Sequence, residues 1–308
     1  MTDHPDTATT RREALKCMAW AGTGALWALN GGIASSSMLG AGPARAVGFT
    51  FLQLSDSHVG FAKPANPDAR ATLREAVAKI IAMPVKPDFI IHTGDITQLS
   101  RDSEFDDADQ ILREAGLPVF FVPGEHDMVD EGAGKAFLAR YGKNTLGAGW
   151  YSFDHKGVHF VGLVNVADLK PGGMGRLGAD QIAWLAKDLA GRPASTPIIV
   201  MAHIPLWTVY ADWGWGTDDA AEALKLLARF GSVSILNGHI HQIAQKVEGR
   251  MVFHTARSTA FPQPAPGTAP SPGPQTVPAG QLHALLGITD VAFRRGAERI
   301  ALVDSTLA

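Results

Sequence analysis

Short motifs rich in histidine and carboxylate residues are the most informative feature of this sequence. The chain has 308 residues and 11 histidines, and five of these histidines fall in such motifs. Mixed imidazole and carboxylate ligands favour first-row divalent metals over calcium, which prefers an all-oxygen shell. In chain order the motifs are Asp56-x-His58, Gly94-Asp95, Gly124-Glu125-His126-Asp127, His203 and Gly238-His239-Ile240-His241.

Each of these motifs directly follows a short apolar run that is typical of a buried strand. In open α/β sheets, ligands bind outside the carboxyl ends of the strands, so five separate segments can converge on one crevice. A glycine beside a ligand allows the chain to turn sharply and approach an ion closely. One such motif would be a weak indication, whereas five in order predict a metal centre.

Alternating strand and helix patterns predict an α/β sandwich that positions these motifs. Apolar runs predict strands at 49–54, 89–91, 119–122, 198–201 and 233–236. Apolar faces at helical spacing predict helices within 73–81, 105–115, 182–189 and 224–228. Further strands are expected at 150–154, 158–164, 251–254, 288–293 and 299–303. The first two of these form a hairpin, and we expect His155 and His159 beside its turn to be solvent-exposed.

A proline-rich segment lies between the last motif and the C-terminus. Residues 262–278 contain seven of the 19 prolines, a density that forbids helix and central strand. We interpret it as an extended loop of the same domain, after which residues 279–308 return to the sheet. The alternative is a linker to a separate tail domain, but the tail is too short to build its own core.

The ordered motifs resemble the calcineurin-like metallophosphoesterase family, whose pattern is D-x-H, G-D, G-N-H-D/E, H and G-H-x-H. The resemblance extends from Asp56 to His241. It implies a two-sheet α/β sandwich with flanking helices and a centre of two divalent metal ions, which could be Mn, Fe, Zn or Co. One ion would be held by Asp56, His58 and His241. The other would be held by Glu125, His203 and His239, and Asp95 would bridge the two.

The same resemblance implies a mechanism of phosphoester hydrolysis. Two ions about 3.5–4 Å apart would hold a bridging hydroxide and bind the phosphoryl oxygens, so that attack and departure proceed in line. His126 would lie unligated near the leaving oxygen as the acid, oriented by Asp127. The favoured function is a phosphodiesterase acting on a small phosphoester. The alternatives are a phosphomonoesterase, such as a nucleotidase, and a metal-binding protein with little turnover.

Glu125 departs from the family pattern, which has asparagine at this position. Glutamate adds a negative charge and one methylene group. Glu125 could be a working ligand that favours harder ions such as manganese or iron. It could instead swing away and weaken the second metal, or mark a site that binds without turnover. We favour the working ligand, since all other motif positions are intact. The lower site charge would then favour monoanionic diesters over dianionic monoesters.

An aromatic stretch follows His203. It could form an apolar wall beside the metals that suits a nucleobase, aryl or lipid group. It could equally be a loop that packs onto the domain or contacts another subunit. The residues concerned are Trp207, Tyr210, Trp213 and Trp215.

Residues 1–46 have the pattern of an export signal rather than of a folded domain. A twin arginine at positions 11 and 12 precedes an uncharged stretch, and residues 44–46 (Ala-Arg-Ala) offer a small-x-small cleavage signal. This resembles a signal for the twin-arginine (Tat) export machinery, cleaved after Ala46 to release residues 47–308 as a periplasmic or secreted domain. The stretch is long enough to be a membrane anchor, but Asn30 to Gly32 and Ser35 to Ser37 interrupt it.

Composition excludes several other classes of protein. With 46% hydrophobic residues the chain can bury a large core, which excludes disorder and collagen-like repeats. The only cysteine, Cys17, lies in the expected signal, so neither an intrachain disulfide nor a thiol nucleophile is expected in the mature protein. A net charge of −3 argues against binding to duplex nucleic acid.

Overall fold

The structure is a computed structural model that describes residues 25–30, 33–38, 48–170, 172–294 and 300–308. The chain divides into two compact units, Met1–Ala46 and Val47–Ala308. In the first unit, β1 (Ala25–Asn30) pairs antiparallel with β2 (Ile33–Met38). The twin arginine and the expected cleavage site after Ala46 lie outside the described residues. No helix among the described residues is long and apolar enough to cross a bilayer.

The second unit contains two β-sheets. The sheet with strand order β13-β12-β3-β4-β5 has parallel strands β3, β4 and β5, whereas β12 runs antiparallel to both β3 and β13. The five strands are β3 (Gly48–Leu54), β4 (Ile90–His92), β5 (Val119–Phe121), β12 (Gly287–Arg294) and β13 (Ala301–Thr306).

The other sheet has the order β10-β11-β9-β8-β7-β6. Its central strands β7, β8, β9 and β11 are parallel, and both edge strands are antiparallel to their neighbours. The six strands are β6 (Tyr151–His155), β7 (Val158–Gly162), β8 (Ile198–Met201), β9 (Val233–Asn237), β10 (Gln245–Glu248) and β11 (Met251–Thr255).

The two sheets pack face to face. Alternate side chains of each strand point to opposite faces, so one face of each sheet contributes to a shared core. Phe51 of β3 and Phe160 of β7 are fully buried in the cluster between the sheets, with ring centroids 5.5 Å apart. Leu52 and Leu54, on the other face of β3, belong to the cluster beneath the helices. A strand that is buried on both faces consists of a continuous run of apolar residues, and the sequence contains such runs at these strands.

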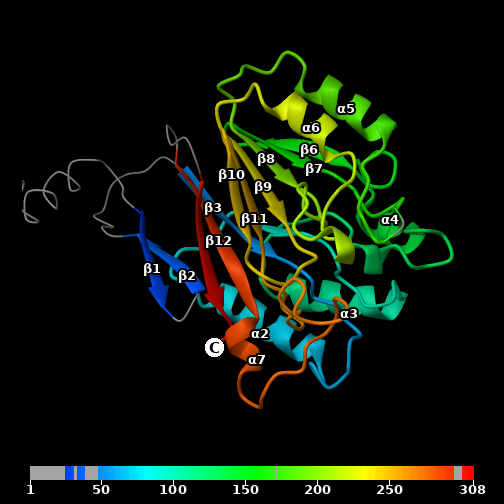
Figure 1. Cartoon of the computed structure of the whole chain (residues 1–308), viewed down its shortest axis with the longest axis vertical. Coiled ribbons are helices and arrows are strands. Elements are labelled where there is room, and N and C mark those ends of the chain that lie inside the picture. Colours follow the sequence, from blue (N-terminus) through cyan, green and yellow to red (C-terminus); the bar gives the residue numbers. More distant parts are fainter. Residues whose placement is uncertain (1–24, 31–32, 39–47, 171, 295–299) are drawn as a thin grey trace, which may run out of the picture. The chain divides into compact units, whose positions relative to one another are not determined.

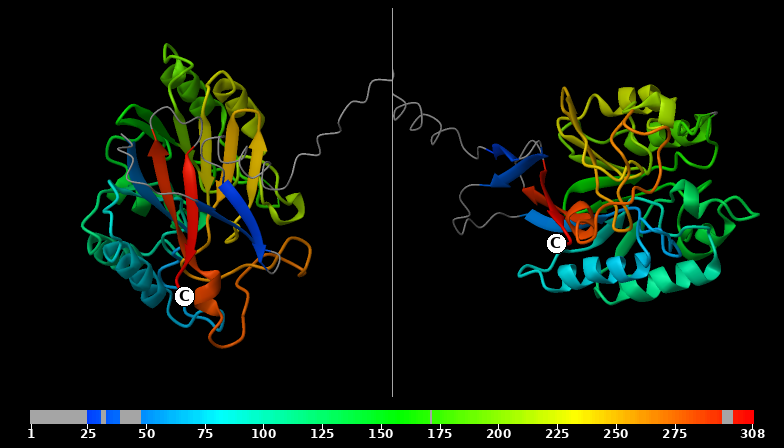
Figure 2. Two further views of the ribbon diagram at one scale, coloured as in Figure 1. Left: turned by 90° about the vertical axis from the view of Figure 1, so that its left-hand side faces the viewer. Right: turned by 60° about the horizontal axis from the view of Figure 1, so that its bottom comes forward.

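Helices cover the outer face of each sheet. α2 and α3 pack on the five-stranded sheet, whereas α5 and α6 pack on the six-stranded sheet (Figures 1 and 2). The carboxylate of Asp68 caps α2 by accepting the backbone N–H of Arg70 and Ala71. The longer helices are α2 (Ala69–Ile81), α3 (Asp102–Arg113), α5 (Ala179–Leu189) and α6 (Ala220–Leu227). The short ones are α4 (Lys135–Tyr141), α7 (Leu282–Leu285) and the 3-10 turns η1 (Glu125–Asp127) and η2 (Ala211–Trp213).

The predicted two-sheet α/β sandwich with flanking helices is therefore confirmed. The described residues between β11 and α7, which include the proline-rich segment, form no helix or strand, and β12 then pairs with β3. The prediction that His159 is solvent-exposed is wrong. Its side chain is fully buried, and Asp154 and Asp188 contact its two ring nitrogens at 2.9 and 2.7 Å, so the ring can be buried with both nitrogens satisfied.

Candidate metal centre

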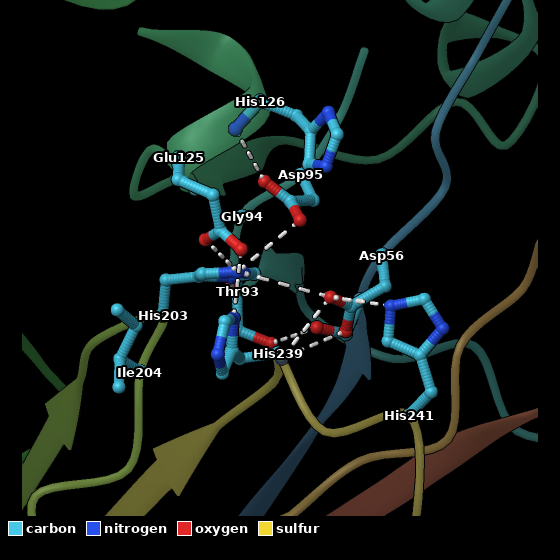
Figure 3. Close-up of polar contacts among 12 residues, drawn as sticks. Asp56, Thr93, Gly94, Asp95, Glu125, His126, His203, Ile204, His239 and His241 are labelled. Carbon is cyan, nitrogen blue, oxygen red and sulfur yellow. Dashed lines mark hydrogen bonds and ion pairs between the residues drawn. The ribbon is translucent and has the colours of Figure 1, made fainter. Parts of the chain in front are cut away.

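The predicted ligands come together where the parallel strands of both sheets end. Asp56 follows β3, Asp95 follows β4 and Glu125 begins η1 beyond β5. From the facing sheet, His203 follows β8 and His239 follows β9. Figure 3 shows these side chains directed toward one another, although they come from both sheets. The carboxyl ends of the strands thus form the crevice that the sequence predicts.

The ligand loops have an unusual backbone conformation. Five of the seven predicted metal ligands have positive φ, a region that residues other than glycine seldom occupy. Each such residue costs on the order of 1–3 kcal/mol and persists only where the surroundings hold it. The ligands concerned and their φ angles are Asp56 (52°), His58 (40°), Asp95 (52°), His239 (69°) and His241 (54°).

Hydrogen bonds between the loops hold this conformation. The N–H of Asp56 donates to the carbonyl of Gly94, and the N–H of His58 donates to the carbonyl of Asp95, both at 2.9 Å. Gly94, with φ of 97°, also lies so close to His203 that a Cβ atom would be 2.5 Å from its Nδ1. The glycine is therefore required both by its backbone conformation and by the approach of this ligand.

One group of possible ligands consists of Asp56, His58 and His241. Nε2 of His241 lies 3.3 Å from Oδ1 of Asp56 and 3.2 Å from Nε2 of His58. Two imidazole nitrogens that face each other beside a buried carboxylate are well placed to share a cation. Burial lowers the pKa of His58 to about 3, so this ring is neutral and its lone pair is available to a metal.

A second group consists of Glu125, His203 and His239. Oε2 of Glu125 lies 2.9 Å from Nε2 of His203, and Oε1 lies 2.9 Å from Nδ1 of His239. Oε2 and both ring nitrogens are nevertheless buried without a hydrogen-bond partner of suitable geometry. Atoms that converge without forming hydrogen bonds are the expected arrangement of ligands around a metal ion. The residues therefore fit a divalent cation.

Asp95 lies between the two groups. Its Oδ2 is 3.4 Å from Nε2 of His58 and 3.4 Å from Nε2 of His203, so one oxygen is equidistant from a histidine of each group. Its Oδ1 accepts the backbone N–H of His126 at 2.9 Å, which fixes the orientation of the carboxylate. This is the position that a bridging ligand requires.

Backbone carbonyls determine which ring nitrogen faces the site. Nδ1 of His203 donates to the carbonyl of Thr93 at 2.7 Å, and Nδ1 of His241 donates to the carbonyl of Phe261 at 2.5 Å. Both rings therefore present Nε2 to the site, and such partners orient metal ligands and raise their basicity. His239 differs from them, because it faces Glu125 through Nδ1.

The metal-free site holds its charges as ion pairs. Burial by itself lowers the pKa of His203, but the carboxylates of Asp95 and Glu125 outweigh it and raise this pKa well above 6.5. Burial raises the pKa of Glu125, but His239 and His203 outweigh that effect and hold the pKa well below its ordinary value. Without metal, His203 is therefore protonated and Glu125 is ionised at neutral pH.

His126 lies beside these groups, but Asp127 does not orient it as we predicted. Nδ1 of His126 donates to the backbone carbonyl of Gln98 at 2.7 Å, which leaves Nε2 for proton exchange. The fully buried carboxylate of Asp127 instead accepts the backbone N–H of Ile96, Thr97 and Gly124 and the hydroxyl of Thr97. Asp127 thus fixes the loops that carry Asp95 and Glu125, and Gln98 orients His126.

The aromatic stretch after His203 does not line the cavity at the site. Trp215 and Trp213 are 1% and 9% exposed and pack with Ile240, which lies between two ligands. Tyr210 packs against this cluster, and Trp207 packs on the core with its ring 5.2 Å from Phe253. The geometry therefore favours the packing alternative, in which these residues support the ligand loop.

Other residues line the cavity, which has a volume of about 150 Å³. Phe61 and Phe261 form its apolar part with ring centroids 4.3 Å apart, and Lys63 is its cationic residue. Sequence reasoning missed these residues because they lie outside the motifs. Gln98 and three residues of the proline-rich segment, Gln263, Gly273 and Pro274, also line it. The rest of the lining consists of predicted site residues, namely His58, Asp95, Glu125, His126 and His241.

Comparison with known proteins gives a family for this site and fold. The sequence profile of the calcineurin-like phosphoesterase family matches residues 49–243, so the chain belongs to this family. A dimetal phosphatase from Danio rerio has the same fold, with a TM-score of 0.56 and 15% identity over 84% of this chain and 99% of that one.

Curated relatives are more similar in sequence. A probable cyclic nucleotide phosphodiesterase of Psychrobacter sp. is 25% identical over 62% of this chain and 57% of its own length. A probable glycerophosphodiester phosphodiesterase of Arcobacter nitrofigilis is 24% identical over 67% of this chain and 77% of its own length. The match to the first of these thus spans little more than half of that relative.

At pH values below the raised pKa of His203, metal binding should release a proton, because the ring must be deprotonated to bind an ion. The apparent affinity for Mn²⁺ should therefore increase with pH by up to about tenfold per pH unit. Calorimetric titration in two buffers with different ionisation enthalpies measures the released protons. Identical binding enthalpies in the two buffers would contradict this prediction.

The positive φ of His239 predicts an inverted order of stability for two variants. In metal-free protein, His239→Gly should be more stable than His239→Ala by about 1 kcal/mol, because alanine must still occupy the left-handed region. Urea unfolding with a chelator present measures the difference. His203 is a matched control, because its φ is not positive. There the alanine variant should be the more stable one.

Proposed function

We propose that this protein is a phosphodiesterase that hydrolyses a small phosphodiester at a centre of two divalent metal ions. The observation that carries the proposal is the pair of ligand groups on either side of Asp95, with His126 beside them. The names of the relatives, cyclic nucleotide and glycerophosphodiester phosphodiesterases, support a diester as the substrate. The small cavity supports a small alcohol group.

When bound, divalent ions would supply Lewis acidity that polarises the phosphoryl oxygens and activates water. The side chains perform the remaining tasks. Asp56, His58 and His241 would hold one ion, and Glu125, His203 and His239 the other. His126 would donate a proton from Nε2 to the departing alcohol oxygen, since its Nδ1 is occupied by the carbonyl of Gln98. Its pKa supports this role, because Asp95 and Glu125 raise it despite the opposing effect of burial.

We further propose that Glu125 is a working ligand. Both of its oxygens lie 2.9 Å from ligand nitrogens of the second group, so the side chain is directed into the site. Its charge leaves two divalent ions and three carboxylates with one net positive charge, where asparagine would leave two. A dianionic monoester loses more attraction from this change than a monoanionic diester does. Glu125 thus favours diesters and harder ions such as manganese.

One assay tests both the function and the role of Glu125. With Mn²⁺, the wild-type protein should hydrolyse bis(nitrophenyl) phosphate faster than nitrophenyl phosphate, and a chelator should abolish both activities. In Glu125→Asn the ratio of diester to monoester kcat/KM should fall several-fold, because the site gains positive charge.

Glu125→Gln is the matched control, since it removes the charge but keeps the length of the side chain. An equal fall of the ratio in both variants assigns the effect to charge. An unchanged ratio in both variants contradicts the role of Glu125. Absence of diester hydrolysis by fully metal-loaded protein contradicts the proposed function.

We also propose that residues 1–46 direct export by the twin-arginine route, supported by Arg11, Arg12 and the small residues at 44 and 46. Replacement of both arginines by lysine should retain the protein in the cytoplasm. Exported wild-type protein should begin at Val47, which N-terminal sequencing measures. A mature chain that still begins near Met1 would support the membrane anchor instead.

A further inference from the structure

The segment Ser258–Gln263 lies beyond the residues that the family profile matches, but it contacts the metal-ligand loops. It follows β11 and includes the first two residues of the proline-rich segment. Its hydrogen bonds reach three predicted ligands, namely Asp56 after β3 and both His239 and His241 after β9. The segment therefore forms a wall of the ligand site rather than a simple connection.

Ser258 is the first contact and is 1% exposed. Its hydroxyl donates to the backbone carbonyl of Asp56 at 2.7 Å. The same oxygen accepts the N–H of Ala260 at 2.8 Å and of Phe261 at 3.1 Å. Asp56 is one of the ligands with positive φ, so its backbone depends on such external contacts. Ser258 thus links the conformation of one ligand to the turn that precedes Phe261.

Phe261 is the second contact. Nδ1 of His241 donates a hydrogen bond to the carbonyl of Phe261 at 2.5 Å, and this bond directs Nε2 of that ring into the site. Its side chain also packs against two ligands, with ring centroids 4.6 Å from His241 and 4.7 Å from His58. Each ligand of the first group therefore contacts Ser258 or Phe261. Asp56 contacts Ser258, whereas His58 and His241 contact Phe261.

Neighbouring contacts hold this segment rigidly. The N–H of Thr259 donates to the carbonyl of Ser55 at 3.1 Å. The buried side chain of Asn66 donates to the carbonyl of Ala260 at 2.7 Å, and Phe61 packs on Phe261. Beyond the turn, Nε2 of Gln263 donates to the carbonyl of His239 at 2.9 Å. Such a fixed outer shell is what keeps metal ligands in binding geometry.

We propose that Ser258 is a positioning residue that sets the affinity for the metal ion held by Asp56, His58 and His241. Its hydroxyl fixes the carbonyl of Asp56 and forms the turn from which Phe261 orients His241. The inference rests on the metal-dependent function proposed above, but it concerns metal affinity and not turnover. Loss of an outer-shell partner typically weakens metal binding by about 10–100-fold.

Titration of the metal-free protein with Mn²⁺ tests this role without any substrate. We expect Ser258→Ala to weaken one of the two binding steps about 10–100-fold and to change the other by less than about threefold. His239→Ala identifies the steps, because it removes a ligand of the other ion and should weaken the step that Ser258→Ala leaves intact. Ser258→Thr, which keeps the hydroxyl, should restore most of the affinity.

Thr289→Val is the matched control for the loss of a buried hydroxyl. Thr289 is 1% exposed, and its hydroxyl donates at 2.6 Å to Asp304, which is not one of the predicted ligands. This variant should lower stability while leaving both Mn²⁺ affinities unchanged. If Ser258→Ala does not fold, the nearly isosteric Ser258→Cys replaces it and should weaken the same step.

Two results separate this inference from the proposed function. If Ser258→Ala or Ser258→Cys lowers stability but leaves both Mn²⁺ affinities within about threefold of wild type, Ser258 has only a structural role and the inference is overturned. If the expected loss of affinity occurs but the metal-loaded wild type hydrolyses no diester, the positioning role stands and the proposed phosphodiesterase function fails.

Discussion

Asp95 is the residue on which the arrangement of the site depends. A single carboxylate oxygen lies 3.4 Å from one histidine of each ligand group, and the side chain is almost completely buried. A buried charge in this position is costly unless opposite charge neutralises it. In metal-free protein the protonated ring of His203 supplies part of that charge. Two divalent cations would supply more, which explains why carboxylates and imidazoles can be concentrated here.

The two-sheet sandwich brings these residues together. β3 and β4 of one sheet and β8 and β9 of the other all end at the same edge of the molecule, and the apolar cluster between the sheets fixes their relative positions. The left-handed backbone of five predicted ligands shows that the loops are held against their local preference. Hydrogen bonds such as that from Asp56 to Gly94, together with the carboxylate of Asp127, maintain this conformation.

Glu125 affects the charge of the site and the protonation of the histidines beside it. It brings a third carboxylate to the centre, and the two histidines of its group contact its two oxygens separately. Asp95 and, after it, Glu125 raise the pKa of His126 and of His203, although burial opposes both shifts. One carboxylate therefore affects both the charge of the site and the proton affinity of two of its histidines.

The fold class, and the set of polar residues that converge at one edge of the sheets, could be predicted from the sequence. Strands buried on both faces and helices with one apolar face produce strong periodic patterns, and polar motifs directly after buried strands are typical of ligand sites. Positions inside those motifs are close in the chain to the backbone that orients them. The structure brings Asp56, Asp95 and His203 together, as the motifs predict.

The surroundings of these residues depend on the tertiary structure. Trp213 and Trp215 pack against Ile240 of the ligand loop. His159 is buried and contacts two carboxylates. The carbonyl of Gln98, rather than Asp127, orients His126. Ser258 and Phe261 reach ligands 202 and 20 residues away in the chain. Contacts of this kind depend on how separate segments pack in three dimensions, and local sequence patterns carry no information about that packing.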